Sequence, residues 1–185
     1  MLLLRKEIKR QMSDFQQKLK DIKAIVFDVD GVLSGNCMVL HPDAEPLRTA
    51  NVKDGYAMNQ AIKRGLILGI ITGGRSESVR IRYEGLGLKD VYLGASIKID
   101  TFGEFLQKHG LKAEQVLYMG DDIPDYEVMQ AAGLSACPAD AVNEIKGISD
   151  YISPYAGGQG CARDVVERTM KAQGLWMNGR EAFGW

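Results

Sequence analysis

Histidine and cysteine are scarce in this chain of 185 residues. His41 and His109 are its two histidines, which argues against a histidine-rich metal site and against a hydrolase built on a histidine relay. Cys37, Cys137 and Cys161 stand far apart without a CxxC pair, so neither a disulfide framework nor a zinc knuckle is expected. The sequence therefore indicates a reducing compartment and a chemistry that depends on carboxylates.

An excess of charge of one sign is also missing. The chain has 23 basic and 24 acidic side chains, so it has no overall basic field to attract nucleic acid or an anionic membrane. The apolar run at residues 1–4 is shorter than the roughly 7–15 residues of a secretory signal core. No stretch approaches the roughly 18 apolar residues of a membrane span. We expect a cytoplasmic protein without nucleic-acid or membrane partners.

The length fits one domain of roughly 100–200 residues, and the 45% share of hydrophobic residues is sufficient for a true core. Residues 1–20 repeat apolar side chains at helical spacing, which predicts an N-terminal helical extension docked on the domain. Residues 21–173 form the expected main domain. Residues 174–185 are an aromatic tail that contains Trp176 and Trp185, and we expect it to lie at a subunit interface.

Apolar runs alternate with helical patterns along the main domain. The expected strands are at 24–27, 66–71, 91–93, 116–119 and 134–137, and the expected helices are at 55–63, 76–84, 99–109, 126–132 and 163–171. Continuously apolar strands between helices are typical of an α/β fold with a doubly wound parallel sheet. Residues 37–40 and 46–52 flank a turn and predict a β-hairpin inserted after the first strand.

Polar side chains follow three of these strands directly. In an open parallel sheet, ligands bind beyond the carboxyl ends of the strands, so these residues carry the functional argument. The first, second and fourth strands are followed by five carboxylates and one threonine: Asp28, Asp30, Asp121, Asp122, Asp125 and Thr72. The sequence therefore predicts an acidic site at one edge of the sheet.

Several carboxylates share one site as anions only when a cation joins them. Oxygen ligands without histidine or cysteine favour Mg²⁺, which commonly keeps phosphate oxygens among its ligands. The Thr72-Gly73-Gly74 turn before a helix offers a hydroxyl and free N–H groups to a phosphate. One carboxylate can act as a nucleophile and another as a general acid and base. Asp28-x-Asp30-Gly31 could instead open a calcium loop, but Val32 and Leu33 occupy positions where such a loop needs a ligand and a glycine.

The order and spacing of these motifs resemble the haloacid dehalogenase superfamily of phosphotransferases over about residues 22–172. Within it, the chain is similar to the 3-deoxy-D-manno-octulosonate 8-phosphate phosphatase family. The segments that carry this similarity are FDVDGVLSG (27–35), NVKDGYA (51–57), IITGG (70–74), GASIK (94–98), YMGDDIPD (118–125) and AGGQG (156–160). The resemblance implies a Mg²⁺-dependent phosphatase that acts on a sugar acid phosphate.

The same resemblance implies a role for each motif residue. Asp28 would be the nucleophile and Asp30 the general acid and base. Asp28, Asp121 and the main-chain carbonyl of Asp30 would hold Mg²⁺, with Asp122 and Asp125 beside these ligands. Thr72, Gly73 and Lys98 would bind the phosphoryl group. The run of Asn51, Lys53, Asp54 and Gly55 would lie near the sugar, and Arg82 would face a phosphate or carboxylate.

Four residues depart from the family pattern. Lys53, Asn59, Gly74 and Gln159 stand where the resembling family more often has arginine. Because arginine binds carboxylates through a two-pronged fork, these departures concern substrate recognition more than catalysis.

The segments between the motifs are too short for a separate cap domain, with 41 residues from Gly31 to Ile71 and 27 from Thr72 to Lys98. In the resembling family a homotetramer closes the site, the hairpins meet at its centre, and a C-terminal segment reaches a neighbour. We expect a homotetramer here.

Three alternatives remain at this point. The nearest is a phosphatase of a nine-carbon sialic-type sugar acid 9-phosphate. A phospho-accepting receiver domain would also use Asp, Thr, Lys and Mg²⁺, but its acceptor Asp follows a middle strand, and the third strand here ends without one. A non-catalytic oligomerisation module is the third. Asp30, which neither non-enzyme needs as an acid, argues against both of them.

Overall fold

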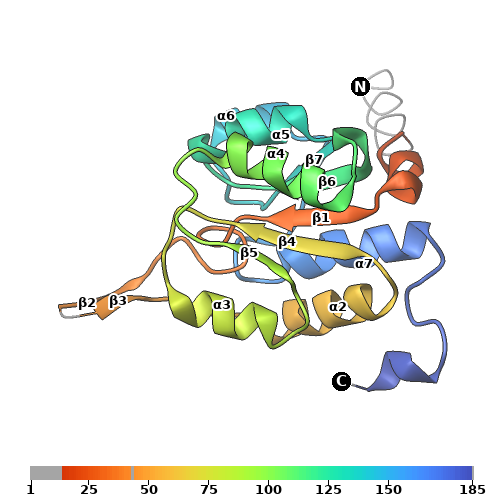
Figure 1. Cartoon of the computed structure of the whole chain (residues 1–185), viewed down its shortest axis with the longest axis horizontal. Helices are drawn as coiled ribbons and strands as arrows, with labels where there is room; N and C mark the ends of the chain where they lie inside the picture. The colour runs from red at the N-terminus through yellow and green to blue at the C-terminus, as the bar shows by residue number, and fades with distance from the viewer. Residues whose placement is uncertain (1–13, 43, 185) are drawn as a thin grey trace.

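A six-stranded parallel sheet forms the centre of the computed structural model, which describes residues 14–42 and 44–184 (Figure 1). Neighbouring strands pair in parallel throughout. Across the sheet their order is β5 (Asp90–Tyr92), β4 (Ile67–Ile71), β1 (Ala24–Phe27), β6 (Val116–Met119), β7 (Leu134–Cys137) and β8 (Tyr151–Ile152). The predicted doubly wound α/β fold is confirmed.

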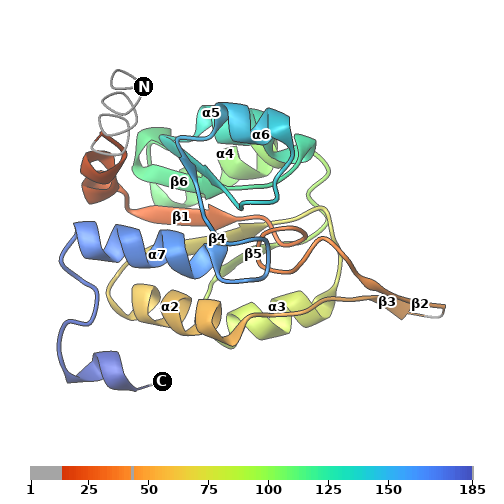
Figure 2. The same cartoon turned by 180° about the vertical axis from the view of Figure 1, so that it is seen from behind.

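Helices cover both faces of this sheet (Figures 1 and 2). One face carries α2 (Val52–Lys63), α3 (Glu77–Glu84) and α7 (Cys161–Ala172), and the other carries α4 (Lys98–His109), α5 (Tyr126–Ala131) and α6 (Asn143–Ile148). Four 3-10 turns complete the described elements: η1 (Leu19–Asp21), η2 (Ala113–Gln115), η3 (Ile123–Asp125) and η4 (Arg180–Phe183). Because side chains alternate along a strand, Ile25 and Phe27 of β1 join one buried cluster, whereas Ala24 and Val26 join the other.

The chain leaves β1 toward β4 and β5, and later fills the other side of β1 with β6, β7 and β8. β1 therefore lies at the point where the strand order reverses, where open α/β sheets bind their ligands. Phe27 pairs with Ile70 of β4 and Met119 of β6, so the three central strands end at nearly the same level. The residues after them meet in one place.

The hairpin after β1 consists of β2 (Val39–His41) and β3 (Ala44–Leu47) and projects away from the body of the molecule (Figure 1). Its second strand ends earlier than the expected 46–52 because Asn51 caps α2. The Asn51 side chain accepts a hydrogen bond of 2.9 Å from Lys53 N, so α2 begins at Val52 and not at residue 55. In the described part of the chain, only this hairpin and α2 separate β1 from β4, and only α3 and β5 separate β4 from α4, so neither segment holds a cap domain.

The two ends of the described chain pack on the domain. Residues 14–18 are helical, and Phe15 and Leu19 are buried in the core; the rest of the expected N-terminal extension lies outside the described residues. The tail runs along α2, where Gln60 and Arg64 donate hydrogen bonds of 3.0 and 2.7 Å to the carbonyls of Gly184 and Asn178. No helix within residues 14–42 and 44–184 is both long and apolar enough to cross a membrane.

Candidate active site

The residues after β1 open a cavity of about 460 Å³ at the carboxyl edge of the sheet. Its lining includes eight of the predicted residues, namely Asp28, Asp30, Thr72, Gly73, Lys98, Asp121, Asp122 and Asp125. Gly31 has a φ of +88°, and a Cβ atom on it would lie 1.9 Å from Asp121 Oδ2. The glycine is therefore needed both for the turn after β1 and for the approach of Asp121.

Lys98 is the cation at the floor of this cavity. Its Nζ donates to Asp125 Oδ1 at 2.7 Å and lies 3.0 Å from Asp28 Oδ1. Burial opposes the charge of Lys98, but Asp28 and Asp125 outweigh that effect and raise its pKa. Asp125 is fully buried and is fixed further by the Tyr118 hydroxyl at 2.9 Å and by Asp121 N at 3.2 Å. Both oxygens of Asp125 are thus occupied by protein donors.

Asp28 and Asp121 are less well satisfied. The carboxylates of Asp28, Asp121 and Asp125 each offer an oxygen within 4.8 Å of the others, and Asp121 Oδ1 is buried without a hydrogen-bond partner. Burial, followed by the charge of Asp125, raises the pKa of Asp28 to about 7. Burial, followed by the charge of Asp28, raises the pKa of Asp121 to about 8. One lysine does not compensate this group, so the edge is suited to a further cation.

The turn after β4 forms the opposite wall. Thr72 is buried, and its Oγ1 accepts a hydrogen bond of 3.2 Å from Gly74 N, so its hydroxyl hydrogen remains available to a ligand. Gly73 and Gly74 line the cavity beside it, together with Ala95 and Ser96 from the turn that leads into α4. The Thr72 hydroxyl, the turn of Gly73 and Gly74 and the Lys98 ammonium therefore line one space, an arrangement suited to an anion.

The residues expected near the sugar lie elsewhere in this single chain. Asn51 caps α2 and donates to Gly158 O at 3.1 Å, and Lys53 is exposed. Asp54 is buried and accepts a hydrogen bond of 2.8 Å from Arg163 N at the start of α7. Arg82 overlies Gly55, where a Cβ atom would lie 2.6 Å from Arg82 Nη2. None of these side chains lines the described cavity, and their contact with a sugar stays a prediction.

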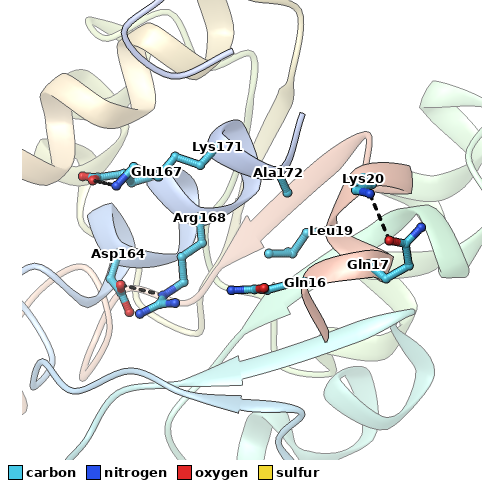
Figure 3. Close-up of a pocket in the computed structure, with 9 residues that line it drawn as sticks. All are labelled: Gln16, Gln17, Leu19, Lys20, Asp164, Glu167, Arg168, Lys171 and Ala172. Carbon is cyan, nitrogen blue, oxygen red and sulfur yellow. Dashed lines mark hydrogen bonds and ion pairs between the residues drawn. The ribbon is translucent and has the colours of Figure 1, made fainter. Parts of the chain in front are cut away.

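A second cavity, of about 510 Å³, lies between η1 and α7 (Figure 3). Its charged side chains have partners within the lining: Arg168 donates to Asp164 at 2.8 Å, Lys171 donates to Glu167 at 2.6 Å, and Lys20 donates to Gln17 at 3.0 Å (Figure 3). This pairing contrasts with the unpartnered oxygen of Asp121. The second cavity has no comparable demand for a ligand.

Known proteins are similar to this chain in sequence and fold. The family model for haloacid dehalogenase-like hydrolases matches residues 94–163. The 3-deoxy-D-manno-octulosonate 8-phosphate phosphatase KdsC of Escherichia coli K12 is 36% identical over 162 residues, which are 88% of this chain and 86% of that protein. The chain belongs to this phosphatase family.

Solved structures of the family agree with this assignment. The enzyme from Yersinia pestis is 34% identical and has a TM-score of 0.84, with 86% of each chain covered. The enzyme from Moraxella catarrhalis is 32% identical and has a TM-score of 0.85, with 88% of this chain and 94% of that chain covered. That structure is a complex with a magnesium ion, a phosphate ion and KDO.

The residues at the carboxyl edge fit Mg²⁺ in this member of the phosphatase family as well. The fit rests on the buried, unpartnered Oδ1 of Asp121 and on a donor set that consists of oxygen atoms. Asp28 and Asp121 have oxygens to offer, whereas those of Asp125 are bound to Lys98, Tyr118 and Asp121 N. This arrangement supports the expectation that Asp125 braces the ligands and does not join them.

Three residues at this site were not predicted from the sequence. Asn36 and Ser96 line the cavity, and Arg48 forms an ion pair with Asp30. Arg48 Nε lies 2.6 Å from Asp30 Oδ1, and Nη2 lies 2.9 Å from Oδ2. A basic residue within the expected second strand of the hairpin, 46–52, was the available signal, but its partner becomes known only once the hairpin's course is known.

Proposed function

We propose that this protein is a Mg²⁺-dependent phosphomonoesterase that hydrolyses 3-deoxy-D-manno-octulosonate 8-phosphate to the free sugar acid and phosphate. The observation that carries the proposal is the group of Asp28, Lys98 and Asp121, in which the carboxylates outnumber the one lysine and lie beside the Thr72-Gly73-Gly74 turn. The relatives named above, which match most of the chain, support the same substrate. Such an enzyme belongs to the route that makes the sugar acid of lipopolysaccharide.

Two carboxylates would share the chemistry. A carboxylate oxygen of Asp28 attacks phosphorus and forms an aspartyl phosphate while the bond from phosphorus to the sugar oxygen breaks. Asp30 gives its proton to that leaving oxygen. Asp30 then takes a proton from the water that attacks the aspartyl phosphate, which releases phosphate and restores Asp28.

The remaining residues would bind and neutralise the phosphoryl group. Thr72, Gly73 and Lys98 supply a hydroxyl, main-chain N–H and an ammonium to its oxygens. Asp28, Asp121 and the Asp30 carbonyl would hold Mg²⁺, which supplies charge neutralisation for the phosphoryl oxygens when bound. Asp122 and Asp125 would stabilise the turn after β6. The Oδ1 of Asp122 accepts a hydrogen bond of 2.8 Å from Ile123 N.

We also propose a homotetramer in the cytoplasm. Val39, Leu40 and Leu47 on the projecting hairpin are 66, 83 and 62% exposed, which supports burial of the hairpin against other copies. Neighbouring subunits would then bring sugar-binding groups to the open mouth of each site, with Asn51, Lys53, Asp54, Gly55 and Arg82 as the residues of this chain assigned to the sugar. The three free cysteines are consistent with a reducing compartment.

A steady-state comparison of substrates tests the proposal. With Mg²⁺ present, we expect kcat/KM for 3-deoxy-octulosonate 8-phosphate to exceed the values for nine-carbon sugar acid 9-phosphates and for common sugar phosphates. A preference for the nine-carbon compounds would assign the enzyme to the sialic-type branch, and a preference for common sugar phosphates would overturn the substrate proposal. Light scattering of the same sample checks the tetramer, which a monomeric mass would contradict.

A further inference from the structure

Arg48 is the first residue after β3, and it reaches from the hairpin to the carboxylate of Asp30. Two of its nitrogens contact the two carboxylate oxygens at 2.6 and 2.9 Å, in a two-pronged pair. The Arg48 side chain is 9% exposed and that of Asp30 is 30% exposed. The pair therefore lies partly out of solvent, where a charge-assisted fork is stronger than at the surface.

The other contacts of Arg48 hold its guanidinium in place. Nη1 donates to Pro46 O at 3.2 Å and lies 3.7 Å from Glu45 Oε2, so β3 itself supports the side chain that it delivers. Gly74 provides the space on the far side, because a Cβ atom there would lie 2.9 Å from Arg48 Nη2 and 3.5 Å from Thr72 Oγ1. The hairpin and the turn after β4 thus both shape the position of this guanidinium.

Within the described residues, the hydrogen bonds of the Asp30 carboxylate come from Arg48. A carboxylate on a partly exposed side chain can rotate, and a planar fork bound to both oxygens fixes that rotation. Proton transfer to the leaving oxygen depends on this orientation, since a displacement of about 1 Å can reduce a rate about 100-fold.

We propose that Arg48 is a positioning residue that fixes the Asp30 carboxylate beside the leaving oxygen, with Gly74 providing the room. This inference rests on the proposed role of Asp30 as general acid and base. It connects the position of the inserted hairpin to the orientation of the acid, so that β3 takes part in the reaction through one side chain.

The test compares two substrates whose leaving groups differ in their need for a proton. Arg48→Ala should lower kcat for the sugar acid phosphate about 100-fold while KM changes little. The loss for p-nitrophenyl phosphate should be at least tenfold smaller, because its leaving group departs without protonation. Arg48→Lys, which keeps the charge but not the fork, should fall between Arg48→Ala and the unchanged protein. Arg80→Ala, which removes a cation paired with Glu77 and Glu84 on the surface of α3, is the matched control and should leave both activities unchanged.

A double-mutant cycle separates positioning from direct binding. If Arg48 acts through Asp30, Arg48→Ala combined with Asp30→Asn should lose no more p-nitrophenyl phosphate activity than Asp30→Asn alone. Additive losses, or equal losses with both substrates, would overturn the inference. Gly74→Ala provides a second route: it crowds the guanidinium without removing it, and it should reproduce a smaller version of the same kcat effect. Failure of the substrate proposal would appear in the unchanged protein, so the two failures are distinguishable.

Discussion

Two buried aspartates at opposite edges of the same sheet differ in how fully neighbouring donors compensate their carboxylates. Asp90 begins β5 at the amino edge, where Lys108 donates to its Oδ1 at 2.7 Å and His109 Nε2 lies 3.0 Å from its Oδ2. Asp28 follows β1 at the carboxyl edge, where it shares Lys98 with Asp125 and lies near Asp121. The Tyr92 hydroxyl also donates to Asp90 Oδ1 at 3.3 Å, so one carboxylate has three partners at the first edge, whereas three carboxylates share one lysine at the second.

The number of partners of an aspartate distinguishes a structural acid from a catalytic one better than its burial does. Both aspartates are nearly inaccessible, at 3 and 6% exposure. Asp90 nevertheless has its hydrogen bonds within the chain, as a structural acid must. The group around Asp28 leaves a buried oxygen without a partner and has two raised pKa values, which an added cation would lower.

Replacement of Asp28 and of Asp90 with asparagine should show the largest difference between the two edges of the sheet. Asp28→Asn removes the nucleophile, so kcat should fall by about 10⁴-fold or more while circular dichroism remains unchanged. Asp90→Asn should leave kcat unchanged and lower the free energy of unfolding by about 1–3 kcal/mol, because Lys108 and His109 lose a charged partner. Substantial turnover by Asp28→Asn would disprove its role as nucleophile.

Mg²⁺ should stabilise the protein by binding at the carboxyl edge of the sheet and not at the amino edge. At about 1,000 times its dissociation constant, Mg²⁺ should raise the free energy of unfolding by about 4 kcal/mol, and a chelator should reverse the effect. Thermal unfolding with and without Mg²⁺ measures the shift. Asp121→Asn should remove most of it, whereas Asp90→Asn should retain it. An equal shift in both variants would place the cation elsewhere.

Asp54 offers an intermediate case, with one oxygen bound to Arg163 N and the other buried without a partner. Burial raises its pKa from 3.8 to about 6. The unfolded chain therefore loses this proton first as pH rises, so the contribution of Asp54 to stability is present below pH 3.8 and is lost by about pH 6. Relative to the unchanged protein, the free energy of unfolding of Asp54→Asn should rise by at most about 3 kcal/mol between pH 4 and pH 7. Urea unfolding across this range measures the difference, and a difference that does not vary with pH would contradict the assignment.

The strand-end residues were predictable because the rule behind them is short-range and geometric. An apolar run identifies a buried strand, and parallel strands present their carboxyl ends at one edge, so Asp28, Thr72 and Asp121 had to meet. The same rule is sufficient to predict that Asp28, Asp121 and Asp125 lie close together.

The features that sequence reasoning missed depend on contacts between distant segments or on very short elements. Arg48 meets Asp30 because the hairpin folds back over 18 residues, which no local pattern specifies. Asp54 turns toward α7 because it accepts a hydrogen bond from Arg163 N, 109 positions away in the chain. β8 has two residues and α6 has six, and neither was predicted from the periodicity of the sequence.

Gly31 connects these observations to the question of how proteins of this fold are told apart. A side chain at this position would meet Asp121 Oδ2 at 1.9 Å before it met any backbone, so the carboxylate would have to move. Alanine there would strain the turn after β1, whose φ of +88° favours glycine, and would displace a carboxylate of the cation site. A related protein that keeps every aspartate but has a side chain at this position is therefore expected to share the fold and to lack the phosphatase activity.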